Sequence, residues 1–169
     1  SGVLWVGTQR GVSRWNRVSE TFTYYRTANG TLANDTVTSV DEGQDGSLWV
    51  GTYGGGLTRI HPGTGEIRNY RNLPGNARSL SDDRVMTVHV DREGIVWVGT
   101  RGGGLNRLDP RTGSITRYRH SPTDPRTLSG DAVSAIATDA SGTLWVGVFD
   151  GGLNRLAPDG SFVRHRHDA

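Results

Sequence analysis

The sequence LWVGT at residues 48–52 decides the fold, because close versions of it recur along the whole chain. The other copies are LWVGT at 4–8, VWVGT at 96–100 and LWVGV at 144–148. Each copy contains one tryptophan: Trp5, Trp49, Trp97 and Trp145. Self-similarity at a fixed spacing of roughly 40–50 residues indicates a repeat protein in which each repeat is one structural unit.

Other phrases keep their place relative to these tryptophans. The pattern G-[LV]-x-R follows each of them, at 11–14, 56–59, 104–107 and 152–155. An apolar-x-x-aromatic pattern comes next, at 22–25, 67–70 and 115–118, with His in the last position at 162–165. A valine stands twelve residues before each of the last three tryptophans: Val37, Val85 and Val133. The repeat therefore extends well beyond the LWVGT phrase.

The sequence of each unit predicts four short strands, and the third unit shows this most clearly. Its first two strands are expected at 85–90 and 95–100. Turn signals join the strands of this unit and lead to the next: DREG at 91–94, glycines at 102–104, DPRTG at 109–113 and a long linker at 120–131. Four short strands per unit indicate an all-β β-propeller of about four blades, each a four-stranded antiparallel sheet.

The repeat boundaries lead to expectations about the ends of the chain. The units are predicted at approximately 1–30, 31–76, 77–126 and 127–169. The first unit opens at its second strand, so the first blade is expected to lack its innermost strand. The last unit stops inside a linker, so the chain is expected to be a piece of a longer propeller. Open propeller ends expose sheet edges and faces, and self-association through them is expected.

The repeated tryptophans are interpreted as packing residues. In a strand, alternate side chains share a face, so Trp49 and Gly51 lie opposite Leu48 and Val50. A blade buries both faces against its neighbours, so the tryptophan is expected to fill the space between blades. The repeated arginines Arg14, Arg59, Arg107 and Arg155 are also expected to be structural. Acids near the start of the first strand are their expected partners: Asp35, Asp82 or Asp83, and Asp131.

The composition excludes several classes of protein. The 169 residues contain 19 arginines, no lysine and 17 acids, which gives a net charge of +2. The arginines do not cluster into a basic stripe, so no nucleic-acid partner is expected. Cysteine is absent, which excludes disulfides and thiolate sites. Apolar runs are only a few residues long, so this chain is not expected to insert directly into a membrane.

Motifs for chemistry are sparse. The glycine clusters lack the lysine and helix of a phosphate-binding loop, and no nucleophile elbow or calcium loop is apparent. His165-x-His167 could form half of a metal site, but these residues align with Tyr118 and His120 of the previous unit. Accordingly, no catalytic residue, metal or cofactor is expected.

The phrases also resemble a known family. LSGDAVSAI at 128–136, LWVG at 144–147 and GGLNR at 151–155 closely resemble the two-component regulator propeller repeat, and the linker at 118–125 resembles its inter-repeat phrase. The resemblance implies seven-bladed, periplasmic sensor propellers of bacterial membrane-bound regulators, often hybrid histidine kinases and sometimes diguanylate cyclases. Such propellers carry no catalysis; they sense a ligand, often a saccharide, and transmit the signal.

The candidate binding residues are those that differ between aligned units. Because strands alternate direction, the turn after the second strand and the linker after the fourth strand share one face. The variable positions there are Gln9, Arg10, Tyr53, Arg101, Phe149, Asp150, Arg78 and Arg126. Aromatic and arginine side chains on rigid loops suit contact with a sugar, another small molecule or a protein. The alternative is that they are permissive surface residues.

Two other functions remain open. The chain could be a scaffold for protein–protein assembly, which needs no ligand pocket. It could instead be a propeller lyase of the streptogramin-lyase type, which resembles this chain in having one tryptophan-centred strand per blade. A lyase needs non-repeated histidines and acids that converge on the central channel. His89 is the candidate inside a predicted strand, and the sequence shows no partner for it.

Overall fold

The computed structural model describes residues 3–165, which form fifteen strands and one short 3-10 helix, η1 (Thr27–Asn29). The strands form four antiparallel sheets in chain order. The first two sheets comprise β1 (Val3–Thr8), β2 (Gly11–Asn16) and β3 (Thr21–Tyr25), then β4 (Val37–Glu42), β5 (Leu48–Thr52), β6 (Gly56–His61) and β7 (Glu66–Tyr70). The last two comprise β8 (Val85–Val90), β9 (Val96–Thr100), β10 (Leu105–Asp109) and β11 (Ser114–Tyr118), then β12 (Val133–Thr138), β13 (Leu144–Val148), β14 (Gly152–Leu156) and β15 (Phe162–His165).

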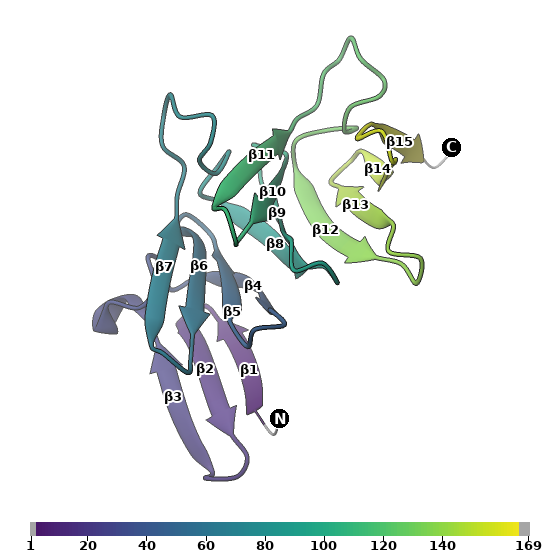
Figure 1. Ribbon diagram of the computed structural model, residues 1–169. Coiled ribbons are helices and arrows are strands. Elements are labelled where there is room, and N and C mark those ends of the chain that lie inside the picture. Colours follow the sequence, from purple (N-terminus) through teal and green to yellow (C-terminus); the bar gives the residue numbers. More distant parts are fainter. Residues whose placement is uncertain (1–2, 166–169) are drawn as a thin grey trace.

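The sheets are the blades of a propeller, as predicted. They follow one another along an arc, and β4, β8 and β12 lie nearest to each other (Figure 1). Side chains join these inner strands directly, since the Ser39 hydroxyl accepts the Val88 N–H at 3.0 Å and Asp41 accepts the Val90 N–H at 2.7 Å. Within residues 3–165 the first blade has three strands and no counterpart of β4, so the prediction of a missing innermost strand is confirmed.

The glycine of each LWVGT phrase makes room for the next blade. A Cβ atom added to Gly51 would lie 2.6 Å from Val85 Cγ1, and one added to Gly99 would lie 2.5 Å from Val133 Cγ1. These are the valines that stand twelve residues before the following tryptophan. The glycine and the valine are therefore two halves of one contact between blades, which explains why both recur at fixed positions.

Gly99→Ala is expected to destabilise the protein by about 1–3 kcal/mol, because the new methyl group must displace Val133 in a tightly packed interface. Gly147→Ala is the matched control, since the nearest atom to its new methyl group would be Ala135 Cβ, at 3.2 Å. Urea denaturation followed by circular dichroism measures both. Equal losses of stability would contradict the assignment of Gly99 to the contact between blades.

Each repeated tryptophan packs beside an aromatic ring of its own blade. Trp49 and Trp97 are only 2% and 4% exposed. Ring centroids lie 5.6–6.1 Å apart in the four pairs, which are Trp5–Tyr25, Trp49–Tyr70, Trp97–Tyr118 and Trp145–His165. The arginine of G-[LV]-x-R lies opposite the tryptophan on the neighbouring strand in all four blades. The repeated residues thus form one cluster per blade.

The predicted partners of these arginines need correction. Arg59 pairs with Asp45 of the β4–β5 turn, with Nη2 2.5 Å from Oδ2, and not with an acid at the start of a strand. The acids at the strand starts fasten the linkers instead. Each accepts a backbone N–H from the linker that leads into its strand: Asp35 from Thr27, Asp83 from Asn72, and Asp131 from His120, at 2.6–2.7 Å. Each of these hydrogen bonds closes a loop of only 8–11 residues. Closing so short a loop costs less chain entropy than bringing the acid to the repeated arginine of its blade.

Candidate functional site

The two ends of the blades differ in the turns and linkers that lie there. The turns that follow β5, β9 and β13, together with the linkers between blades, lie at one end, which we call the rim face. The turns between the first and second strands and between the third and fourth strands of each blade lie at the other end, which we call the turn face. This arrangement follows from the antiparallel strand order.

Three of the predicted residues occupy equivalent places on the rim face. Tyr53, Arg101 and Phe149 each follow the second strand of their blade directly. Each backbone N–H extends the pairing with the inner strand by one residue: Tyr53 to Thr36 O, Arg101 to Arg84 O and Phe149 to Ala132 O, at 2.8–2.9 Å. The scaffold therefore holds the backbone of these residues firmly while their side chains differ between blades.

Tyr53 and Arg101 contact each other across the boundary between two blades. The Arg101 guanidinium lies over the Tyr53 ring, with Cζ 5.6 Å from the ring centroid. Arg101 Nη1 also donates a hydrogen bond to the Tyr53 hydroxyl. A cation over an aromatic face is electrostatically attracted to it, so the tyrosine restrains the direction in which the arginine points.

Arg101 and Phe149 share a small pocket between the third and fourth blades, which we call the rim pocket. Its volume is about 220 Å³, and it is lined by Met86, Arg101, Ala132, Val133, Ser134 and Phe149. Phe149 is 70% exposed although it is a large apolar residue. The rim pocket thus combines an apolar wall with a guanidinium and a hydroxyl group.

Three residues near the rim pocket were not predicted from the sequence. Met86 and Ser134 are the extra residues of β-bulges near the starts of β8 and β12. A bulge re-aims a side chain locally, and bulges are common next to functional sites. Arg84 stands where the other blades have Thr36 and Ala132, so comparison of the aligned strand starts would have found it.

Arg84 is held by a neighbouring acid. Its Nη2 lies 2.7 Å from Asp82 Oδ2. Burial raises the pKa of Asp82, but the hydrogen bonds from Arg84 outweigh it and leave the pKa below its usual value. The ion pair fixes the residue whose backbone oxygen receives the Arg101 N–H at 2.9 Å.

Gln9, Arg10 and Asp150 also lie on the rim face, but they do not hydrogen-bond to Tyr53 or line the rim pocket. Arg10 donates its backbone N–H to the Thr8 hydroxyl at 3.0 Å. Among residues 3–165, neither Gln9 nor Arg10 forms a side-chain hydrogen bond or ion pair. Asp150 is exposed and has a φ of 57°, a left-handed turn conformation that aspartate tolerates.

Arg78 and Arg126 lie away from the rim pocket. The Arg126 guanidinium reaches Asp159 in the β14–β15 turn, at 2.7 Å, which belongs to the turn face. Its backbone oxygen accepts the Phe162 N–H at 2.7 Å, so this linker runs down the outer strand of the fourth blade. Arg78 occupies the equivalent position in the preceding linker. The structure therefore separates these two arginines from Tyr53, Arg101 and Phe149.

His89 has partners that the sequence did not reveal. Its Nδ1 lies 3.5 Å from Asp41 Oδ2 of the second blade, and its Nε2 lies 3.1 Å from the Thr138 hydroxyl of the fourth. Burial raises the pKa of Asp41, but hydrogen bonds from His89 and the Val90 N–H leave it below its usual value. His89 thus links three inner strands, and the interpretation that it stands alone was wrong.

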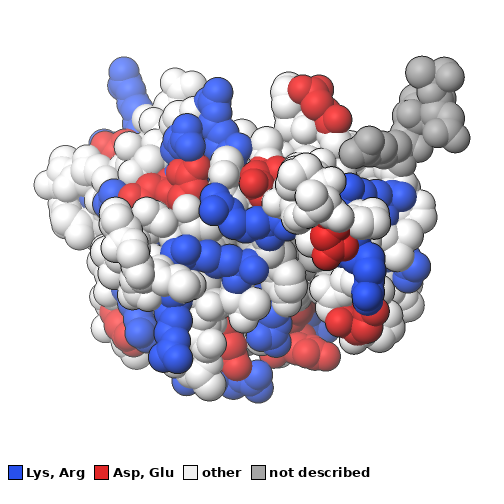
Figure 2. All heavy atoms as spheres, turned by 90° about the horizontal axis from the view of Figure 1, so that it is seen from above, with Lys and Arg blue, Asp and Glu red and all other residues white. Residues whose placement is uncertain are grey.

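The described residues show no metal site and no membrane-spanning helix. Residues 3–165 contain no group of three or more His, Asp or Glu side chains arranged to hold a metal ion. His167 lies outside the described residues, so the His165-x-His167 pair is not described. No helix in the described part is long and apolar enough to cross a bilayer. Arginines and acids are interspersed on the face shown in Figure 2.

The sequence matches a known repeat family in three places. Residues 31–54, 79–102 and 127–150 match the family described as two component regulator propeller. This chain carries two-component regulator propeller repeats. Each matched segment includes the first two strands of a blade and ends in the turn at the rim face. No curated protein matches this chain.

Solved structures support this assignment. This chain is similar to the extracellular domain of a hybrid two component system from B. thetaiotaomicron, with 25% identity and a TM-score of 0.77 over 96% of the chain. A second such domain from B. thetaiotaomicron has 26% identity and a TM-score of 0.79 over 100% of the chain. This chain spans only 22% and 21% of the lengths of these two structures.

More distant structures share the fold alone. Virginiamycin B lyase from Staphylococcus aureus has 19% identity and a TM-score of 0.71 over 99% of this chain, which spans 53% of the lyase. At this identity the similarity identifies a β-propeller and does not extend to the chemistry of the lyase.

Proposed function

We propose that this propeller is a non-enzymatic sensory module of a bacterial membrane-bound signalling protein. It binds an extracytoplasmic ligand at the rim pocket and transmits the signal. The main support is the contrast between the uniform core of the blades and the three different side chains at one rim position, Tyr53, Arg101 and Phe149. The similarity to extracellular domains of two component systems supports the location and the class of protein.

The chemistry of the rim pocket suits a small molecule such as a saccharide. Phe149 offers an exposed ring for the apolar face of a sugar, and Arg101 carries N–H donors for hydroxyl or carboxylate oxygens. The Tyr53 contact holds the Arg101 side chain in position before the ligand arrives. A preorganised side chain loses less conformational freedom on binding, which favours affinity.

Phe149→Ala and Arg101→Ala are each expected to weaken ligand binding by about tenfold or more, because aromatic and arginine anchors dominate binding energy. A saccharide panel is screened by thermal shift, since a ligand that binds only the folded state raises the melting temperature. Arg17→Ala is the matched control, because this exposed arginine lies in the β2–β3 turn on the turn face. If both rim variants bind every hit as tightly as the unsubstituted protein, the rim pocket is not the site.

An assembly scaffold is the second candidate, and one observation favours it. Leu57 and Leu105 are fully buried by the next blade, whereas their counterpart Leu153 is 42% exposed. At the other end, Leu4 and Val6 are 54% and 43% exposed. We propose that these two apolar faces mediate self-association. Sedimentation velocity on the rim variants distinguishes the scaffold from the sensor. A protein that is only a scaffold keeps its oligomeric state in these variants and binds no saccharide.

A further inference from the structure

The tryptophan of the third and fourth blades shares an acid with the turn beside it. Trp97 Nε1 donates to Asp91 Oδ2 at 2.8 Å, and Trp145 Nε1 donates to Asp139 Oδ2 at 2.9 Å. Both acids stand six residues before the tryptophan. The Ser141 hydroxyl and then the Trp145 indole hold the pKa of Asp139 at about 2. The indole N–H is therefore an effective donor to an oxygen at this place in the repeat.

The second blade departs from this pattern. Gly43 stands six residues before Trp49, so the carboxylate is missing. Asp45 does not replace it, because its Oδ2 is taken by the Ser47 hydroxyl at 3.0 Å and by Arg59 at 2.5 Å. Among residues 3–165, Trp49 Nε1 has no hydrogen-bond acceptor. The Trp49 side chain is only 2% exposed, but its Nε1 is not sealed from solvent.

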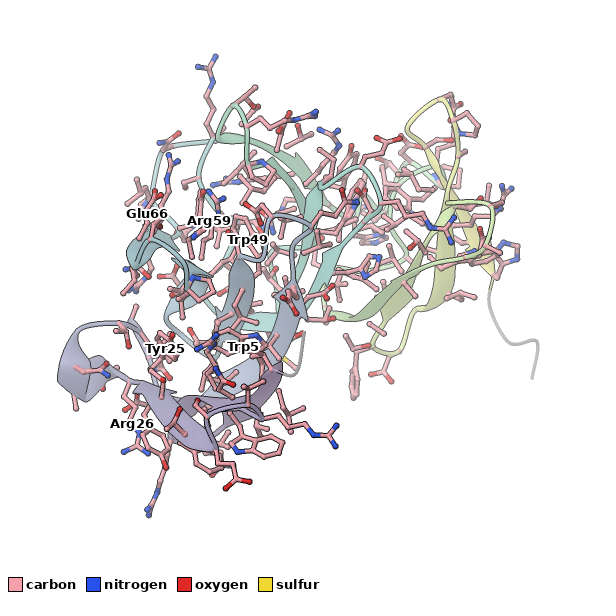
Figure 3. All side chains as sticks on the ribbon, turned by 60° about the horizontal axis from the view of Figure 1, so that its bottom comes forward. Trp5, Tyr25, Arg26, Trp49, Arg59 and Glu66 are labelled. Carbon is pink, nitrogen blue, oxygen red and sulfur yellow. The ribbon has the colours of Figure 1, made fainter. Side chains whose placement is uncertain are left out.

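Trp49 lines a groove of about 270 Å³ on the turn face, between the second and third blades. We call it the turn groove; it is lined by Gly43, Gln44, Asp45, Trp49, Arg59, Val90, Glu93, Gly94, Pro110 and Arg111. Trp49 and Arg59 lie side by side (Figure 3), with Arg59 Cζ 5.6 Å from the centroid of the Trp49 ring. A Cβ atom at residue 43 would lie 2.8 Å from Asp45 Oδ1 and 3.4 Å from Trp49 Nε1, so residue 43 adjoins the free donor and the Asp45 carboxylate.

The equivalent groove between the third and fourth blades serves as an internal comparison. It is larger, at about 730 Å³, and both Trp97 and Asp91 line it. There the indole N–H is already satisfied by Asp91. The Trp49 N–H is free to donate to an oxygen supplied from outside, whereas the N–H groups of Trp97 and Trp145 are occupied by their own acids.

The charges around the turn groove decide what kind of oxygen fits. Arg59 is paired with Asp45, and Arg111 lies 3.2 Å from Asp109. The Glu93 carboxylate forms no ion pair among the described residues. A carboxylate or phosphate would find no free cation here and would be repelled by Glu93. A hydroxyl group can accept from Trp49 and donate to a carboxylate, because it is both donor and acceptor.

We propose that the turn groove binds a small, neutral polyhydroxy compound. One hydroxyl oxygen accepts the Trp49 Nε1 hydrogen, and neighbouring hydroxyls donate to Asp45 and Glu93. The apolar carbons of the ligand lie against Val90 and Pro110. This site is at the opposite end of the blades from the rim pocket and does not depend on the function proposed for that pocket.

The test follows the indole N–H signals of a ¹⁵N-labelled chain, with myo-inositol as the probe. The Trp49 signal, identified with Trp49→Phe, is expected to shift and reach saturation, while the Trp97 and Trp145 signals stay in place. Sodium acetate at equal concentration is expected to leave the Trp49 signal unchanged. An unchanged signal with inositol overturns the proposal, and a response to acetate alone overturns the choice of a neutral ligand.

A second variant tests the position of the site. Gly43→Asn places a neutral acceptor beside Trp49 Nε1, so inositol binding is expected to weaken by about tenfold or more. Gly63→Asn is the matched control in another turn of the same blade. Unchanged inositol affinity in Gly43→Asn overturns the proposal. The titration of the unsubstituted chain decides the question if either variant fails to fold, which the Trp97 and Trp145 signals report.

Discussion

Trp97→Ala is expected to lower the free energy of unfolding by about 3–5 kcal/mol, the usual cost of removing a large side chain from a well-packed core. Trp97 is 4% exposed and packs in one cluster with Leu105, Val133 and Leu144. Its ring lies 6.1 Å from that of Tyr118. The substitution also leaves Asp91 without one of its donors. These contacts hold the third blade together, join it to the fourth blade and stabilise the turn between β8 and β9.

Urea denaturation monitored by far-ultraviolet circular dichroism measures this loss. Trp15→Ala is the control, because Trp15 lies outside the repeated phrase, is only partly buried and stacks on the exposed Phe22. It is expected to cost about 1 kcal/mol or less, as for a substitution away from the core. A loss below about 1 kcal/mol for Trp97→Ala would show that the tryptophan does not hold the blades together.

Asn106→Ala is expected to destabilise the protein by about 2–4 kcal/mol, because it removes the hydrogen bonds that a fully buried side chain makes to Ser81 and Val98. Asn106 is fully buried in β10. Its Oδ1 accepts the Ser81 N–H at 2.9 Å, and its Nδ2 donates to the Ser81 hydroxyl and to Val98 O at 2.8 and 3.3 Å. The side chain thus fastens the linker to the blade that this linker enters.

The same urea experiment measures this effect. Asn76→Ala is the control, because Asn76 is exposed in the same linker and its side chain accepts one backbone N–H, that of Arg78. A double-mutant cycle of Asn106→Ala with Ser81→Ala isolates the contact, and a coupling near zero would contradict it. Asn154 makes the same bonds to Ser129 and Val146 in the fourth blade, so Asn154→Ala serves as a replicate.

The candidate site was only partly predictable from the sequence. Aligning the units located Tyr53, Arg101 and Phe149, because all the blades share one framework and these positions differ within it. The same criterion also selected Arg126, whose linker runs down the outside of the blade to Asp159. Alignment shows which residues vary, but the direction that a linker takes depends on contacts with another blade.

Contacts between blades account for most of what the sequence did not show. His89 meets Asp41 and Thr138, each about one repeat away in sequence. Arg59 takes Asp45 from a turn of its own blade and not an acid at a strand start. The free N–H of Trp49 could have been suspected from Gly43, but the burial of the Trp49 side chain and its groove are visible only once the third blade is in place.

The sequence by itself determined the strands, the blades and the packing role of the tryptophan. The period of two within each strand, and the fixed distance from valine to tryptophan, are properties of the chain alone. The tertiary structure decided which side chains meet at the rim pocket and the turn groove, because those side chains come from different blades. Gly51 shows the difference: the sequence placed it on the tryptophan face, and only the next blade revealed that Val85 fills the space beside it.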